Sequence, residues 1–68
     1  MNKPKKIRNL KRGEYFTLRP ISHPKENQVY IREDYDRYEQ KYECIKFSDM
    51  CKTRYFKGDK KVYTHFIF

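Results

Sequence analysis

The sequence predicts one small, mainly β domain, built either as a closed five-stranded barrel or as a bent antiparallel sheet. Its 68 residues suffice for one hydrophobic core but not for two. Short runs rich in aromatic and β-branched residues alternate with turn-forming residues, whereas no segment has the apolar periodicity of a long helix. Seven Tyr and five Phe indicate a folded chain despite a mean hydropathy of -1.21. At most one short helical turn is expected.

Residues 1–9 are predicted to form a basic, partly flexible N-terminal arm, with Ile7 as its apolar anchor, and residues 10–68 the single β domain. The first strand is expected over 14–19, where apolar and polar side chains alternate with a period of two. Gly13 supplies the turn before it. Two prolines then predict a loop over 20–27.

The second strand is predicted over 28–32 and is followed by an acidic, exposed turn over 33–40. A third strand is expected over 41–47, where apolar residues fall on both faces, so a bulge or a two-sided environment is predicted.

After the third strand, N-cap residues predict one helical turn over 49–53 and then a short strand over 54–56. Gly58 is expected to take a positive φ in the next turn, and 62–68 to form the fifth strand. One face of that strand is expected to carry Val62, Thr64, Phe66 and Phe68. SH3-like and OB-like barrels are both compatible with this order, and closure is favoured because open edges are costly.

The net charge of +8 is unevenly distributed along the chain. Residues 1–25 sum to +7, residues 26–43 to -3 and residues 44–68 to +4. Two basic blocks around an acidic middle predict a polyanionic partner, with the acidic segment turned away from it. A chain that is merely kept soluble by excess lysine is the alternative.

Aromatic residues interleaved with cations are typical of surfaces that bind single-stranded nucleic acid, because bases stack on the rings and cations neutralise phosphates. We therefore predict a non-enzymatic module that binds RNA or DNA. The candidate binding residues are Lys5, Lys6, Arg8, Lys11, Arg12, Tyr15, Tyr30, Arg54, Tyr55, Lys57, Lys60 and Lys61. The predicted core aromatics are Phe16, Phe47, Phe56 and Phe66.

A protein-interaction module, for example a small virion component or a modulator of a host complex, is the competing interpretation. Tyr30, Tyr35 and Tyr38 would be its anchors beside the acidic turn, since tyrosine is enriched at binding hot spots.

No cofactor, metal or small-molecule substrate is expected. Cys44 and Cys51 are separated by six residues, a spacing unlike that of structural zinc sites, so we expect a buried Cys44 and an exposed Cys51 thiol. The two glycines exclude the glycine-rich phosphate loops. An RNA-cleaving toxin is the one enzymatic alternative, with His65 as general base beside a cation from Arg54, Lys60 or Lys61.

No apolar run is long enough to span a bilayer, and the basic start lacks the apolar core of a signal peptide. We therefore expect no membrane partner and a cytoplasmic location, including a host cytoplasm or a virion.

Four segments resemble small basic proteins carried by bacteriophages and mobile elements of gut bacteria: LKRGEYF (10–16), VYIREDY (29–35), KYECIKF (41–47) and YFKGDKKVYTHF (55–66). The resemblance implies a compact domain in a phage or mobile-element setting and assigns no catalytic residue. The opening also looks like the first strand of SH3-like domains, in which a glycine turn precedes an aromatic strand.

Overall fold

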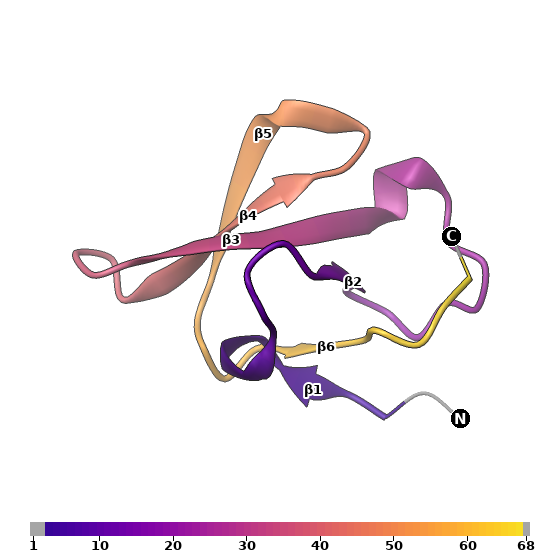
Figure 1. The fold of residues 1–68 in the computed structure, drawn as a ribbon, viewed down its shortest axis with the longest axis horizontal. Helices are drawn as coiled ribbons and strands as arrows, with labels where there is room; N and C mark the ends of the chain where they lie inside the picture. The colour runs from indigo at the N-terminus through magenta and orange to yellow at the C-terminus, as the bar shows by residue number, and fades with distance from the viewer. Residues whose placement is uncertain (1–2, 68) are drawn as a thin grey trace.

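The computed structural model describes residues 3–67 and has a mainly β fold (Figure 1). Its elements are β1 (Lys5–Lys6), the 3-10 turn η1 (Ile7–Asn9), β2 (Tyr15–Thr17), the 3-10 turn η2 (Glu26–Gln28), β3 (Val29–Asp36), β4 (Lys41–Lys46), β5 (Asp49–Phe56) and β6 (Lys61–Val62). None of the helical segments within residues 3–67 has the length and apolar character needed to cross a membrane.

The strands form a four-stranded antiparallel sheet in the order β2-β3-β4-β5 and a separate two-stranded ribbon of β1 and β6. One isolated bridge joins them: the Thr17 N–H donates to the Tyr63 carbonyl at 2.8 Å, and the Tyr63 N–H donates to the Thr17 carbonyl at 2.9 Å. The predicted all-β class and bent antiparallel sheet are confirmed. The described strands do not close into a barrel, so the predicted preference for closure was wrong.

Two irregularities bend the sheet. The β3–β4 register shifts between Arg32 and Tyr35, which adds one residue to β3. The β4–β5 register shifts between Ile45 and Lys46, and β5 folds over at the top of Figure 1. Because extra residues increase local twist, the sheet curls around its core without completing a cylinder.

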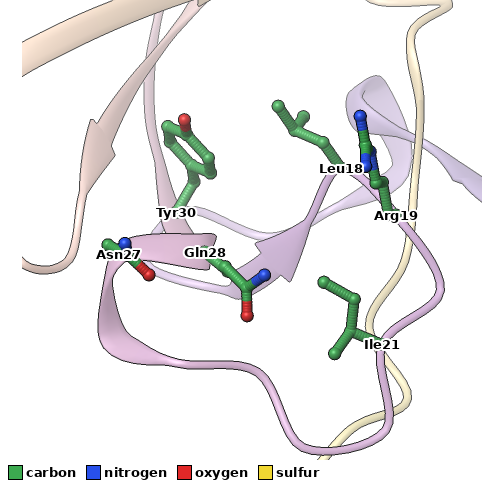
Figure 2. Close-up of a pocket in the computed structure, with 6 residues that line it drawn as sticks. All are labelled: Leu18, Arg19, Ile21, Asn27, Gln28 and Tyr30. Carbon is green, nitrogen blue, oxygen red and sulfur yellow. The ribbon is translucent and has the colours of Figure 1, made fainter.

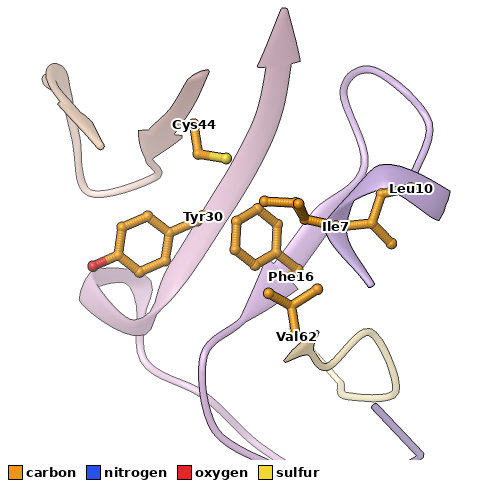
Figure 3. Packing of buried hydrophobic residues seen from close by; sticks show 6 residues of the cluster. All are labelled: Ile7, Leu10, Phe16, Tyr30, Cys44 and Val62. Carbon is orange, nitrogen blue, oxygen red and sulfur yellow. The ribbon is translucent and has the colours of Figure 1, made fainter. Parts of the chain in front are cut away.

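The core gathers side chains from both ends of the chain around Phe16 (Figure 3). The Phe16 ring stacks on Tyr30 with centroids 5.8 Å apart and meets the Phe56 ring edge-on at 6.3 Å. The buried cluster consists of Ile7, Leu10, Phe16, Tyr30, Cys44 and Val62. Ile7 is 0% and Leu10 4% exposed, so the two apolar residues of the basic N-terminal segment lie in the core.

The opposite face of the sheet is also apolar. The strand register aligns Tyr15, Ile31 and Ile45 across β2, β3 and β4, and the rings of Tyr15 and Phe47 lie 5.6 Å apart. Ile31, Ile45 and Phe47 are only partly buried. The predicted two-sided environment is therefore present, and Phe47 belongs to this outer face rather than to the core.

Several predicted boundaries were wrong. Asp49–Phe56 forms one strand where a helical turn was expected over 49–53, and the Asp49 carboxylate accepts the Cys51 N–H at 3.1 Å within this strand, after the turn at 47–48. β3 continues through the acidic residues to Asp36, which leaves the turn only residues 37–40.

The last strand was predicted over 62–68, but β6 covers only Lys61–Val62. Beyond it, Phe66 is half-buried, and Phe68 lies outside the described residues.

Backbone conformation identifies two special turn positions. Gly13 has φ 88° in a turn that is closed by a hydrogen bond from the Glu14 N–H to the Lys11 carbonyl, at 3.0 Å. The turn predicted before the first strand is therefore confirmed. Gln40 has φ 54° at the end of the β3–β4 turn, where Asp36 accepts the Tyr38 N–H at 2.9 Å. A residue with a Cβ is disfavoured in this left-handed region, unlike glycine.

Substitutions at these two positions should have opposite effects on stability. We expect Gly13→Ala to lower the free energy of unfolding by about 1–2 kcal/mol and Gln40→Gly to raise it by about 0.5 kcal/mol. Urea unfolding followed by circular dichroism measures both changes. Equal signs for the two variants would contradict the assigned backbone conformations.

The two cysteines should differ in reactivity. Burial, opposed in part by the nearby Arg32 charge, raises the pKa of Cys44 from 9.0 to about 12, whereas Cys51 is exposed. Since the thiolate is the reactive form, we expect a thiol reagent at about pH 8 to label Cys51 in the folded protein and Cys44 only after denaturation. Mass spectrometry of the labelled peptides checks this, and fast labelling of Cys44 in the folded state would contradict it.

The same pKa shift predicts how stability depends on pH. An unfolded Cys44 loses its proton near pH 9 while the folded one keeps it to about pH 12, so this contribution is full below pH 9 and is lost as the pH rises. We expect the loss of unfolding free energy above pH 9 to be smaller in Cys44→Ala than in the wild type. Cys51→Ser is the control and should keep the wild-type profile.

Candidate nucleic-acid interface

The β1–β6 ribbon places two lysines directly opposite each other. Lys6 pairs with Lys61 in antiparallel register, and both are exposed. Residues directly opposite in an antiparallel pair project from the same face, and like charges in this position are destabilising. The ribbon therefore concentrates positive charge at a cost to its own stability.

The turn between β5 and β6 packs against η1, as the lower left of Figure 1 shows. The Ile7 N–H donates to the Lys60 carbonyl at 2.9 Å, and the Gly58 carbonyl accepts the Arg8 backbone N–H at 3.1 Å and its Nε–H at 3.2 Å. These bonds hold the Arg8 side chain beside the lysine-rich turn.

Gly58 permits this packing through its small size. The turn is present as predicted, with the Lys60 N–H donating to the Lys57 carbonyl at 3.0 Å, but the positive φ expected at Gly58 is not adopted. A Cβ at this position would lie 3.2 Å from Tyr42 Cε2 and 3.5 Å from Arg8 Cβ. The sequence interpretation explains Gly58 by its conformational freedom, whereas in the structure the absence of a Cβ allows its backbone to lie close to Tyr42 and Arg8.

We call the resulting surface the basic ribbon. It consists of Lys5, Lys6, Arg8, Lys57, Lys60 and Lys61. All six are exposed, and none of them forms an ion pair within residues 3–67. Asp59 is the single acidic residue in the two segments that build it. Six of the twelve predicted binding residues are therefore neighbours in the fold, and Lys5, which is opposite the buried Val62, projects from the other face of the strand pair than Lys6 and Lys61.

Lys11 and Arg12 extend this surface past the Gly13 turn. They line, together with Lys5 and Asn9, an open hollow of about 480 Å³. Arg12 Nε lies 3.2 Å from Asp34 Oδ1, but both side chains are exposed, so this ion pair contributes little to stability.

Tyr30 is not part of the surface. It is 6% exposed and stacks on Phe16, so the prediction that it faces outward for base stacking was wrong. The prediction assumed that Val29 and Ile31 mark the only core face, whereas both faces of this strand are covered by apolar contacts.

The Tyr30 ring instead borders a small hollow of about 190 Å³ (Figure 2). Side chains from the end of β2, the following loop and η2 surround it: Leu18, Arg19, Ile21, Asn27 and Gln28.

The remaining predicted residues lie on β2 and β5. Tyr15 packs against Phe47 on the outer face of the sheet. Tyr55 is exposed and borders a hollow that Asp36, Glu39 and Lys41 also line. Arg54 lies over the Phe56 ring, 5.7 Å from its centroid. Tyr55 and Arg54 are not joined to the basic ribbon by a contact described within residues 3–67.

The sequence interpretation names Tyr35 as an anchor of the competing protein-interaction module but misses its pairing with Tyr42 beside the ribbon. The Tyr35 and Tyr42 rings lie 4.8 Å apart, and both line a hollow of about 300 Å³ with Arg8, Gln40 and Gly58. A hairpin with a four-residue turn at 37–40 would have placed Tyr35 opposite Tyr42. The sequence analysis instead predicts a longer turn over residues 33–40, which includes Tyr35.

The residues considered for metal binding and catalysis lie in different environments. No group of three or more His, Cys, Asp or Glu side chains suited to a metal ion occurs in the described chain, residues 3–67. His65 is exposed in the segment after β6, and Cys44 is buried while Cys51 is exposed, as expected for the two thiols.

Comparisons with protein-family models, with curated proteins and with solved structures find no significant match.

Proposed function

We propose that this protein is a non-enzymatic module that binds nucleic acid through the basic ribbon. The observation that supports this most directly is the placement of Lys6 opposite Lys61, next to Arg8 and the 57–60 turn. A surface that gathers unpaired cations against their mutual repulsion is explained by a polyanionic ligand that removes the repulsion on binding.

The flexible lysine side chains and the shallow surface favour phosphates over bases as the main contacts of the ribbon. Lysine acts as a point charge without a fixed hydrogen-bonding plane, so it contributes affinity and little sequence preference. The proposal includes a cytoplasmic location, where nucleic acid is accessible.

The salt dependence of binding tests the proposal. For a fluorescent single strand of about twelve nucleotides, four to six phosphate contacts give a slope of log affinity against log salt of about -3 to -4. Fluorescence anisotropy across a salt series measures it. A slope near zero, or no binding at low salt, would overturn the proposal.

Lys61→Glu should separate binding from stability. Replacing the repulsion with Lys6 by an attraction is expected to raise the free energy of unfolding by about 0.5 kcal/mol. The slope of log affinity against log salt should become less negative by about 1, and the affinity should drop for every sequence alike. Urea unfolding and anisotropy measure the two effects.

Lys25→Glu and Lys52→Glu are the matched controls for this variant. They make the same change in net charge at exposed positions outside the ribbon. Both should bind more tightly than Lys61→Glu. Equal losses in all three variants would show that net charge, and not the ribbon, determines affinity.

A further inference from the structure

The hollow beside the basic ribbon combines an aromatic ring, a cation and an amide. Its five lining residues come from three separate parts of the chain: η1 supplies Arg8, the β3–β4 hairpin supplies Tyr35, Gln40 and Tyr42, and the turn before β6 supplies Gly58. A volume of about 300 Å³ is at the lower end for small-molecule sites, which suits one planar ring system. Arg8 belongs both to this hollow and to the basic ribbon, so the two surfaces are continuous.

The aromatic part of the hollow is held in place. Arg32 Cζ lies 4.4 Å from the centroid of the Tyr42 ring, and Gly58 approaches the edge of that ring closely. Tyr42 in turn contacts Tyr35, a residue that remains 44% exposed. An exposed tyrosine ring supported from behind offers a stacking platform that loses little conformational freedom when a ligand binds.

The polar groups are arranged around this platform. The Arg8 Nε–H donates to the Gly58 carbonyl at 3.2 Å, which fixes the guanidinium. The terminal N–H groups of the guanidinium are left to bind a ligand. Gln40 contributes a side-chain amide that can both donate to and accept from a base edge. Aromatic face, cation and amide together are the groups that recognise an unstacked nucleobase.

We propose that this hollow receives one unpaired nucleobase, stacked on Tyr35, from a strand whose phosphates lie along the basic ribbon. The inference rests on the proposed function and narrows it to single-stranded nucleic acid, because the bases of a duplex are stacked inside and cannot enter the hollow. It also assigns a binding role to Tyr35, Gln40 and Tyr42.

Two probes distinguish base contacts from phosphate contacts. One is an oligothymidylate of about twelve nucleotides, and the other is a strand of the same length that has the sugar-phosphate backbone without bases. We expect Tyr35→Leu to weaken binding of the first about tenfold and to leave binding of the second unchanged. Tyr35→Phe keeps the ring and should retain wild-type affinity for both.

Tyr38→Leu is the matched control, because Tyr38 is fully exposed on the same hairpin and lies outside the hollow. It should bind both probes as the wild type does. A similar loss in Tyr38→Leu would overturn the assignment of the stacking site to Tyr35.

A photo-cross-link on the wild-type protein gives a readout that does not depend on any variant folding. With 5-iododeoxyuridine in the strand, the cross-link is expected in the tryptic peptide 33–37, which contains Tyr35 and is separated from Tyr38 and Tyr42 by Arg37 and Lys41. If Tyr35→Leu lost affinity for both probes, the variant could not separate a lost stacking contact from a folding defect, and the cross-link on the wild-type protein would decide between them. Absence of the cross-link from peptide 33–37 would overturn the inference.

The two proposals fail in different ways. Salt-dependent binding of both probes with equal affinity would overturn the nucleobase site and leave the backbone-binding function standing. Failure of both probes to bind would overturn the proposed function and the nucleobase site together.

Discussion

Burial of Ile7 is the contact on which the arrangement of this protein depends. Its side chain lies in the same cluster as Phe16 and Val62 (Figure 3), and its N–H donates to the Lys60 carbonyl at 2.9 Å. One apolar residue in a strongly basic segment thus ties the start of the chain to its last turn. Removing a fully buried isoleucine side chain typically costs about 2–5 kcal/mol, which is a large share of the stability of a domain this small.

The thinness of the molecule limits what kind of site it can hold. Its principal extents are 34 × 25 × 15 Å, and the fully enclosed side chains are few. With so little interior, polar and charged groups cannot be withdrawn from water to form a deep reaction centre. The cations of the basic ribbon and the tyrosines Tyr35, Tyr38 and Tyr55 all lie on the outside of this thin molecule.

The sequence was informative where a local rule determines the outcome. The turn at Gly13, the burial of Phe16 and Cys44, and the all-β class all follow from short-range patterns, and the structure has each of them.

The remaining features depend on contacts between distant residues, which a single sequence does not reveal. Tyr30 is buried because both faces of β3 are apolar. The alternation of side chains along the strand had predicted that Tyr30 faces the solvent. The extra residue between Arg32 and Tyr35 changes which side chains share a face, and it is this shift that pairs Tyr35 with Tyr42. Gly58 is explained by its close approach to Tyr42 and to Arg8, which lies fifty positions earlier in the chain.

The open sheet leaves two outer strands, β1 and β5, whose backbone groups could pair with a second molecule. β1 has only two residues, both lysine, and β5 has a disrupted register and carries Lys52 and Arg54. Short length, irregular backbone and positive charge are the devices by which natural sheets prevent edge-to-edge aggregation. The lysines on β1 therefore also protect concentrated solutions of this protein from fibre-like association, whatever ligand they meet.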